Sequence, residues 1–201
     1  MSTIMKIIAA SVAALAVTAC GNPKDANKGN FSKAIQAYLD TKPVFCPHFP
    51  KVLEKNGWSK NTEREVDALV DAGLLSTRDT EVKAIFGEKM LPATEYQVTD
   101  LGKQYLAKEG NDSERLGRLC TGKYKLTGID NFTEPGPVPF SSVTASQVNF
   151  RYEITDLAEW TKSEKVRSAY ASTFKEFEKN QDKAMLVLTN DGWIHERLFR
   201  R

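Results

Sequence analysis

The chain has 201 residues, with 28 Lys and Arg against 26 Asp and Glu, and its net charge is +2. This balance produces no long-range field, so net charge gives no argument for binding nucleic acid. The length allows one domain or two small ones with a sizeable core, and after residue 20 no apolar run approaches the ~20 residues that a transmembrane helix needs.

The N-terminus has the features of an export signal. Lys6 precedes an apolar run over residues 7–17, which is too short to span a bilayer and is followed by small residues. The run Val17-Thr18-Ala19-Cys20 resembles the lipobox of bacterial lipoproteins. In that family the cysteine thiol receives a diacylglyceryl group, the peptide is cut just before it, and the new amine is acylated, for example with palmitate. The resemblance predicts a signal peptide over residues 1–19 and a lipid anchor at Cys20; an ordinary signal with a chance cysteine is the alternative.

The same resemblance implies a location. A lipidated Cys20 would hold the protein in the cell envelope, and Gly21 after it, rather than Asp, resembles sorting to the outer membrane with the body facing the periplasm. Residues 20–30 are polar and rich in Gly, Asn and Lys without periodicity. Such a composition predicts a flexible tether, with a root-mean-square reach of roughly 17 Å for ten residues. The membrane is therefore the first expected partner.

Two further cysteines, Cys46 and Cys120, remain once Cys20 is assigned to the lipid. In an oxidising compartment this pair predicts a disulfide, which would close a loop of about 75 residues. The alternative is a tetrahedral zinc site made with His48 and His195, the only two histidines. The four residues are scattered singly, without the close pairs of structural zinc sites, so we expect no metal and no other cofactor.

Residues 31–110 are predicted to form a first half of mixed helix and strand. Asn30 can cap a helix over residues 31–40. Thr62 and Glu65 form a capping box for a second helix, which Gly73 ends. The remaining predicted elements are extended chain over residues 74–78, 81–86 and 96–99 and a helix over residues 101–108.

The order of these elements resembles a winged helix over residues 31–108. The resemblance rests on Asp71-Ala72-Gly73-Leu74-Leu75 before the strands and on Tyr96-Gln97-Val98-Thr99-Asp100-Leu101-Gly102-Lys103 before the last helix. In that family a strand pair forms the wing and the preceding helix enters the DNA groove. Here that helix is acidic, and acidic side chains are repelled by phosphate, so we expect the shape without nucleic-acid binding. Against Arg64 alone it carries Glu63, Glu65, Asp67 and Asp71.

Residues 111–201 are predicted to form a second half, a small antiparallel sheet with a helix packed on one face. The clearest strand covers residues 148–155, where apolar and polar residues alternate. Asn190-Asp191-Gly192 predicts a hairpin turn, and Thr161 begins a helix with an aromatic stripe that runs to residue 179. Other predicted strands cover residues 123–132, 184–189 and 193–196. The predicted fold class is α+β: a winged-helix-like half and a small antiparallel sheet with a packed helix, clamped by one disulfide.

Scattered motifs resemble a group of proteobacterial lipoproteins of uncharacterised activity. The resemblance covers most of the chain after the signal and supports location and architecture rather than mechanism. The motifs are Tyr96-x-x-Thr99-x-x-Gly102, Cys120-x-Gly122-Lys123, Tyr152, Trp160 and Leu188-Thr189-x-Asp191-Gly192-Trp193.

The sequence contains no Gly-x-Ser-x-Gly elbow, no Gly-rich phosphate loop and no His-Glu-x-x-His pair, so we assign no catalytic residue. These absences favour a non-enzymatic binding or accessory protein, including an immunity-type factor, with an envelope protein as its partner. Two alternatives remain: a periplasmic enzyme of unrecognised type that uses His48 or His195, and a carrier of small apolar ligands in the second half. The basic tail Arg197, Arg200 and Arg201 could touch anionic lipid.

Overall fold

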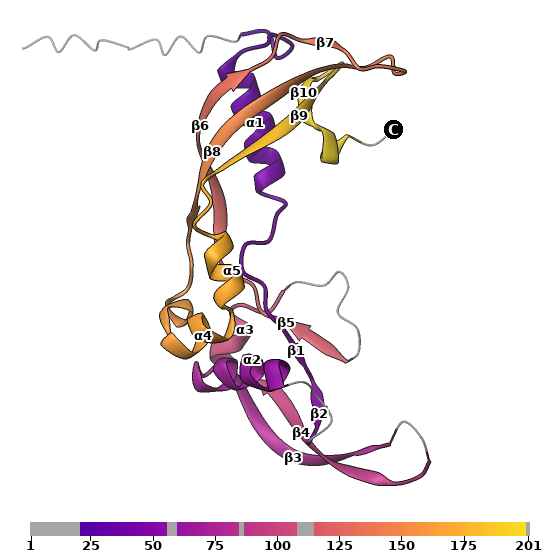
Figure 1. The fold of residues 1–201 in the computed structure, drawn as a ribbon, viewed down its shortest axis with the longest axis vertical. Helices are drawn as coiled ribbons and strands as arrows, with labels where there is room; N and C mark the ends of the chain where they lie inside the picture. The colour runs from indigo at the N-terminus through magenta and orange to yellow at the C-terminus, as the bar shows by residue number, and fades with distance from the viewer. Residues whose placement is uncertain (1–20, 56–59, 85–86, 108–114, 200–201) are drawn as a thin grey trace, which may run out of the picture.

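The computed structural model describes residues 21–55, 60–84, 87–107 and 115–199. Helices and antiparallel sheets build an elongated, curved molecule with a body at each end, which confirms the α+β class (Figure 1). We call these the upper body (residues 21–42, 123–155 and 180–199) and the lower body (residues 45–55, 60–84, 87–107, 115–121 and 157–177), after their places in Figure 1. Within the described ranges, no helix is long and apolar enough to cross a membrane.

The upper body is an antiparallel sheet with α1 on one face. β10, β9, β8 and β6 are neighbours in that order, and the short β7 pairs with β8. Helix α1 lies on the sheet because Phe31, Ala34, Ile35 and Leu39 share one side of the helix and are all buried. The elements are α1 (Lys28–Leu39), β6 (Lys123–Phe132), β7 (Gly136–Pro137), β8 (Thr144–Thr155), β9 (Gln181–Thr189) and β10 (Gly192–His195).

The lower body joins a three-stranded antiparallel sheet, in the order β2-β4-β3, to a strand pair and several helices. Its core contains Phe45, Leu69, Leu74, Leu119 and Val166, all at most 2% exposed. The elements are β1 (His48–Pro50), β2 (Val52–Glu54), α2 (Lys60–Asp71), β3 (Leu75–Lys83), β4 (Met90–Val98), α3 (Asp100–Lys103) and β5 (Leu116–Arg118). The 3-10 helix η1 (Glu159–Lys162) and helices α4 (Glu164–Ala169) and α5 (Ala171–Glu176) complete this body.

The helix on the sheet is not the one that the sequence predicts. The predicted helix over residues 161–179 is divided at Tyr170, whose φ and ψ of −110° and 32° separate α4 from α5. Its buried residues belong to the core of the lower body, and α1 takes its place on the sheet. An apolar stripe predicts that a helix is buried but does not specify the surface that buries it.

Neither core follows the predicted division at residue 110. The core of the upper body combines α1 from the first half with strands of the second, and the core of the lower body adds Trp160 and Tyr170 to the first half. The chain therefore passes between the bodies after α1, after β5, after β8 and after α5.

Several bonds fasten these crossings at the waist, by which we mean residues 43–46, 119–123 and 155–158. Cys46 and Cys120 form the predicted disulfide, with an S–S distance of 2.04 Å. The Thr121 hydroxyl donates to the carbonyl oxygen of Asp156 at 3.2 Å and accepts from the backbone N–H of Ala158 at 2.9 Å. Gly122 has φ of 86°, and a Cβ there would lie 2.9 Å from Leu157 Cδ2. The waist is thus a close, cross-linked junction.

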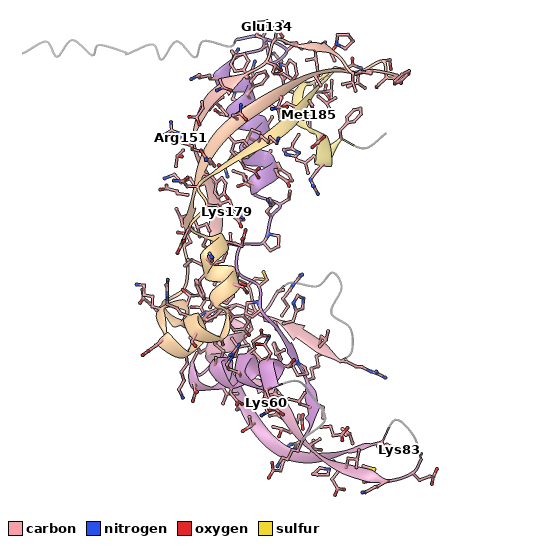
Figure 2. All side chains as sticks on the ribbon, in the orientation of Figure 1. Lys60, Lys83, Glu134, Arg151, Lys179 and Met185 are labelled. Carbon is pink, nitrogen blue, oxygen red and sulfur yellow. A yellow bond between two sulfur atoms is a disulfide. The ribbon has the colours of Figure 1, made fainter. Side chains whose placement is uncertain are left out.

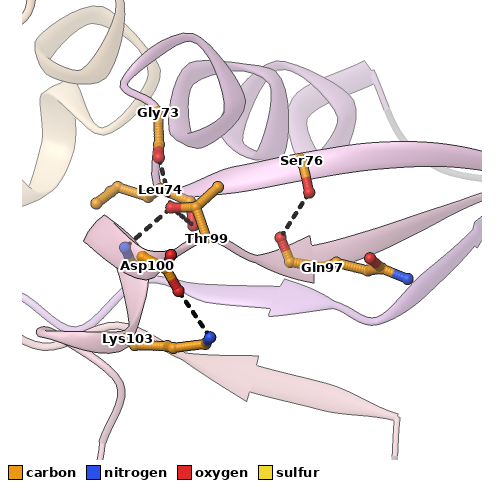
Figure 3. Close-up of polar contacts among 8 residues, drawn as sticks. Gly73, Leu74, Ser76, Gln97, Thr99, Asp100 and Lys103 are labelled. Carbon is orange, nitrogen blue, oxygen red and sulfur yellow. Dashed lines mark hydrogen bonds and ion pairs between the residues drawn. The ribbon is translucent and has the colours of Figure 1, made fainter.

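Thr99 joins three elements of the lower body (Figure 3). Its hydroxyl donates to the carbonyl oxygen of Gly73 at 2.7 Å, just after α2, and accepts from the N–H of Gly102 at 3.0 Å, as the cap of α3. A side chain at Gly102 would collide with the carbonyl oxygen of Leu74. The spacing Thr99-x-x-Gly102 therefore has a structural cause. The helix predicted over residues 101–108 begins at Asp100 and ends at Lys103.

The predicted tether is wrong for residues 22–30. Helix α1 begins at Lys28, and its cap is Asn27, whose side chain accepts from the N–H of Asn30 at 2.9 Å. Before it, the chain lies against the sheet, where the indole Nε1 of Trp193 donates to the carbonyl oxygen of Lys24 at 3.0 Å. Polar composition indicated a solvated linker, but backbone groups supply the contacts that hold it.

Candidate partner-binding groove

A groove of about 680 Å³ lies between α2 and α4. Helix α2 contributes one wall because Val66 and Leu69 turn into the core and leave its charged residues on the outer side. Helix α4 contributes the other wall, and Lys60 marks the N-terminal end of α2 in Figure 2. The lining residues are Lys60, Glu63, Arg64, Asp67, Ala68, Asp71, Glu164, Lys165 and Ser168.

Two contacts between helices hold the walls of the groove together. Lys165 Nζ lies 2.5 Å from Asp71 Oδ2, but both side chains are well exposed, so this pair contributes at most about 1 kcal/mol. Beneath it, the hydroxyl of Tyr170 donates to the carbonyl oxygen of Glu65 at 3.2 Å. Tyr170 is 8% exposed, and its burial raises the pKa of the phenol, which therefore stays neutral. The buried contact sets the spacing of the walls better than the surface pair does.

The lining has three basic and four acidic side chains and neither histidine nor cysteine. Charges of both signs in an open groove suit the polar surface of another macromolecule, which they can orient and select. Among the described residues, no three His, Cys, Asp or Glu side chains are grouped to hold a metal ion. The groove is therefore an open surface depression of mixed charge.

His195, one of the two predicted candidate bases, is held in the upper body. It is 3% exposed, its ring stacks on Tyr38 with centroids 3.5 Å apart, and its Nδ1 accepts from the N–H of Arg197 at 3.1 Å. Burial, followed by the charges of Arg197 and Lys42, lowers the pKa of His195 to about 4. The imidazole is therefore neutral at physiological pH and a weak base.

His48 is exposed on β1, in the lower body, so the structure does not bring the two histidines together. The zinc alternative for His48 also fails, because the sulfur atoms of Cys46 and Cys120 are bonded to each other and offer no thiolate. The proposed anchor, Cys20, and the tail residues Arg200 and Arg201 lie outside the described residues.

The space between α1 and the sheet, where an apolar ligand would have to bind, is filled with aromatic rings. Phe31 meets Phe132 edge to face at 4.8 Å between centroids and Trp193 at 4.9 Å. This packing is that of a protein core.

The sequence did not predict the groove. From the sequence, the acidic residues of α2 indicated only that this helix does not bind nucleic acid, and no local signal pairs residues 60–71 with residues 164–168. Only the packing of α4 on α2 makes them one surface.

No protein-family model matches the chain, and neither does any curated protein or solved structure.

Proposed function

We propose that this protein is a lipid-anchored lipoprotein of the bacterial cell envelope that binds a protein partner through the groove between α2 and α4, without catalysing a reaction. Two observations support the location: the lipobox-like run before Cys20 and the Cys46–Cys120 disulfide, a bond typical of oxidising compartments. With Gly21 after the cysteine, the outer membrane, facing the periplasm, is the proposed site.

The observation that carries the binding function is the mixed charge of the open groove. A partner with a complementary pattern would pair with both signs, and other envelope proteins would be rejected by like charges. An accessory or immunity-type role needs this kind of selectivity. The filled space beneath α1 and the neutral, buried His195 give no support to an apolar-ligand carrier or to an enzyme that uses this histidine.

The order α2, β3, β4 and α3 supports a winged-helix-like arrangement within residues 31–110, although α1 packs in the upper body. Its acidic groove residues fit a protein partner better than a phosphate backbone. We therefore propose a winged-helix-like shape that serves protein recognition.

Replacement of Cys20 with Ser tests the anchor. The variant cannot receive a thioether-linked lipid, so we expect the protein to leave the membrane fraction, since no helix among the described residues is long and apolar enough to cross a membrane. The measurement is membrane fractionation, with a carbonate wash, of cells that express wild type or variant. Continued membrane retention of Cys20→Ser would overturn the anchor assignment.

Charge reversal tests the groove. The double substitution Lys60→Glu and Arg64→Glu removes two of its three basic side chains and should weaken partner capture by at least about tenfold, because like charges at an interface cost several kcal/mol. The readout is the yield of one partner, identified by mass spectrometry, after crosslinking of the anchored protein and pull-down.

The matched control is Lys33→Glu with Lys175→Glu, which reverses the same charge on exposed helix positions of α1 and α5. This control should capture the partner as wild type does. Equal capture by the groove variant would show that the groove is not the site, and the absence of any specific envelope partner in all arms would count against the binding function itself.

A further inference from the structure

The fold holds the chain almost immediately after Cys20. The side-chain Nδ2 of Asn30 donates to the carbonyl oxygen of Asn22 at 2.9 Å. A Cβ on Gly192 would lie 2.8 Å from the carbonyl oxygen of Pro23, so the turn between β9 and β10 touches the chain closely at that point. Together with the bond from Trp193 to Lys24, these contacts fix the N-terminal segment to the end of the upper body.

Little chain remains between this fixed point and the proposed anchor. Only Gly21 separates Cys20 from Asn22, and two extended residues span roughly 7 Å. A flexible tether of ten residues would let the upper body take any orientation relative to the membrane. A connection of two residues restricts that orientation. A lipid on Cys20 would therefore keep this end of the upper body at the bilayer surface.

The same end carries an apolar loop that projects from the sheet. Residues 135–143, which include β7 and the turn into β8, contain no charged side chain, and Figure 1 places β7 at the end of the molecule where α1 begins. Within the loop Phe140 is fully exposed, at 110% of the reference area, and Pro137 and Pro139 are exposed as well. Glu134, which precedes the loop, marks this end in Figure 2.

The loop is built to hold Phe140 outward. The N–H of Val138 donates to the carbonyl oxygen of Val143 at 2.9 Å, and the N–H of Ser141 donates to the carbonyl oxygen of Val138 at 3.1 Å. Phe140 itself adopts φ of 59°, which is unfavourable for a bulky side chain. The fully exposed phenyl ring gains little from packing within the described residues, so it is available for contact with another surface.

We propose that the end of the upper body is a membrane-contacting surface and that Phe140 inserts into the interface of the bilayer that holds the lipid on Cys20. The proposal rests on the lipid anchor of the proposed function and adds the orientation of the body. An apolar side chain such as Phe gains free energy by burial at the boundary between headgroups and acyl chains, and an anchor that already confines the loop makes even a weak insertion effective. The groove, in the opposite body, would then face away from the membrane toward its partner.

A pair of tryptophan substitutions tests this orientation. Phe140→Trp places an indole at the loop, and Met90→Trp places one on β4 at the other end, opposite Lys83, which is labelled in Figure 2. Both sites are exposed, so neither change disturbs a core. Wild type and both variants, each purified in detergent after expression of the full sequence in bacteria, are mixed with phosphatidylcholine vesicles with or without brominated acyl chains, and wild type supplies the background of the three native Trp residues.

We expect brominated lipid to quench the added emission of Phe140→Trp, with a shift to shorter wavelength, and to leave that of Met90→Trp unchanged. If both variants float with the vesicles but neither is quenched, or both are quenched equally, the orientation is wrong and the anchor stands. If the proteins do not float with the vesicles, the assignment of a lipid anchor to Cys20 is wrong, and the proposed orientation is wrong as well.

Discussion

Replacement of both Cys46 and Cys120 with Ser should lower the free energy of unfolding by on the order of 4 kcal/mol, the value expected for opening a closed loop of this length. The two residues are 74 positions apart, so the bond restricts a large part of the unfolded chain. A loss of this size is comparable to the whole stability of many small domains. We therefore expect the double variant to be partly unfolded at 37 °C.

The position of the bond adds a local effect. Phe45, next to Cys46, exchanges backbone hydrogen bonds with Thr121, next to Cys120, and these residues belong to the crossings at the waist. Without the disulfide, the amide protons of Phe45 and Thr121 should exchange with solvent faster than those in the strands of the upper body. Urea denaturation measures the global change, and hydrogen exchange the local one.

Wild type under reducing conditions is the control, because it removes the bond without changing any residue. It should unfold at the same urea concentration as the double variant. If the double variant were within 1 kcal/mol of oxidised wild type, a range within which most surface substitutions fall, the disulfide would not be the clamp that its position indicates.

Local features of the fold could be predicted from the sequence because their causes are local. Gly73 ends α2 with φ of 74°, and Asn190-Asp191-Gly192 turns β9 into β10, with Gly192 at φ of 121°. The disulfide also followed from the sequence, since a compartment and a count of cysteines suffice to predict it. These predictions needed no knowledge of how distant segments pack.

The predictions that failed concern features that depend on contacts between residues far apart in the sequence. Residues 22–30 are polar, and the Trp193 indole that binds Lys24 is 169 positions away. The apolar stripe of α1 could have packed in either body, and it packs against Trp193 and Phe132 because the turns of the sheet bring these rings to it. The sequence did not predict the groove for the same reason, since the groove exists only where α4 packs on α2.

Several of the residues that the sequence singled out as motifs have structural roles. Thr99 and Gly102 join α2, β3 and α3; Gly122 is packed at the waist; and Trp193 fastens the N-terminal segment. None of these residues lines the groove. These positions support the architecture of this chain and carry no information about a binding partner.

Phe45 lies among the aromatic rings of the lower core, and its replacement with Ala should cost about 3–5 kcal/mol, the range for a buried Phe. It is 2% exposed, and its ring contacts those of Trp160, Tyr170 and Phe174 at centroid distances of 5.2 to 5.4 Å. These three rings belong to the segment that contains η1, α4 and α5, which lies between β8 and β9 in the sequence but packs in the lower body. Phe45 therefore holds the segment of η1, α4 and α5 against the rest of the lower body.

This arrangement makes the effect of Phe45→Ala specific as well as large. Loss of the ring leaves a cavity bordered by η1 and α5, so α4 should loosen from α2 and the groove should widen before the sheet of the upper body unfolds. Hydrogen exchange should thus rise first in residues 159–177. The matched control is Phe140→Ala, which removes the same ring from a fully exposed position and should change the free energy of unfolding by less than about 0.5 kcal/mol. Equal effects of the two substitutions on chemical denaturation would contradict the packing that places Phe45 at the centre of the lower body.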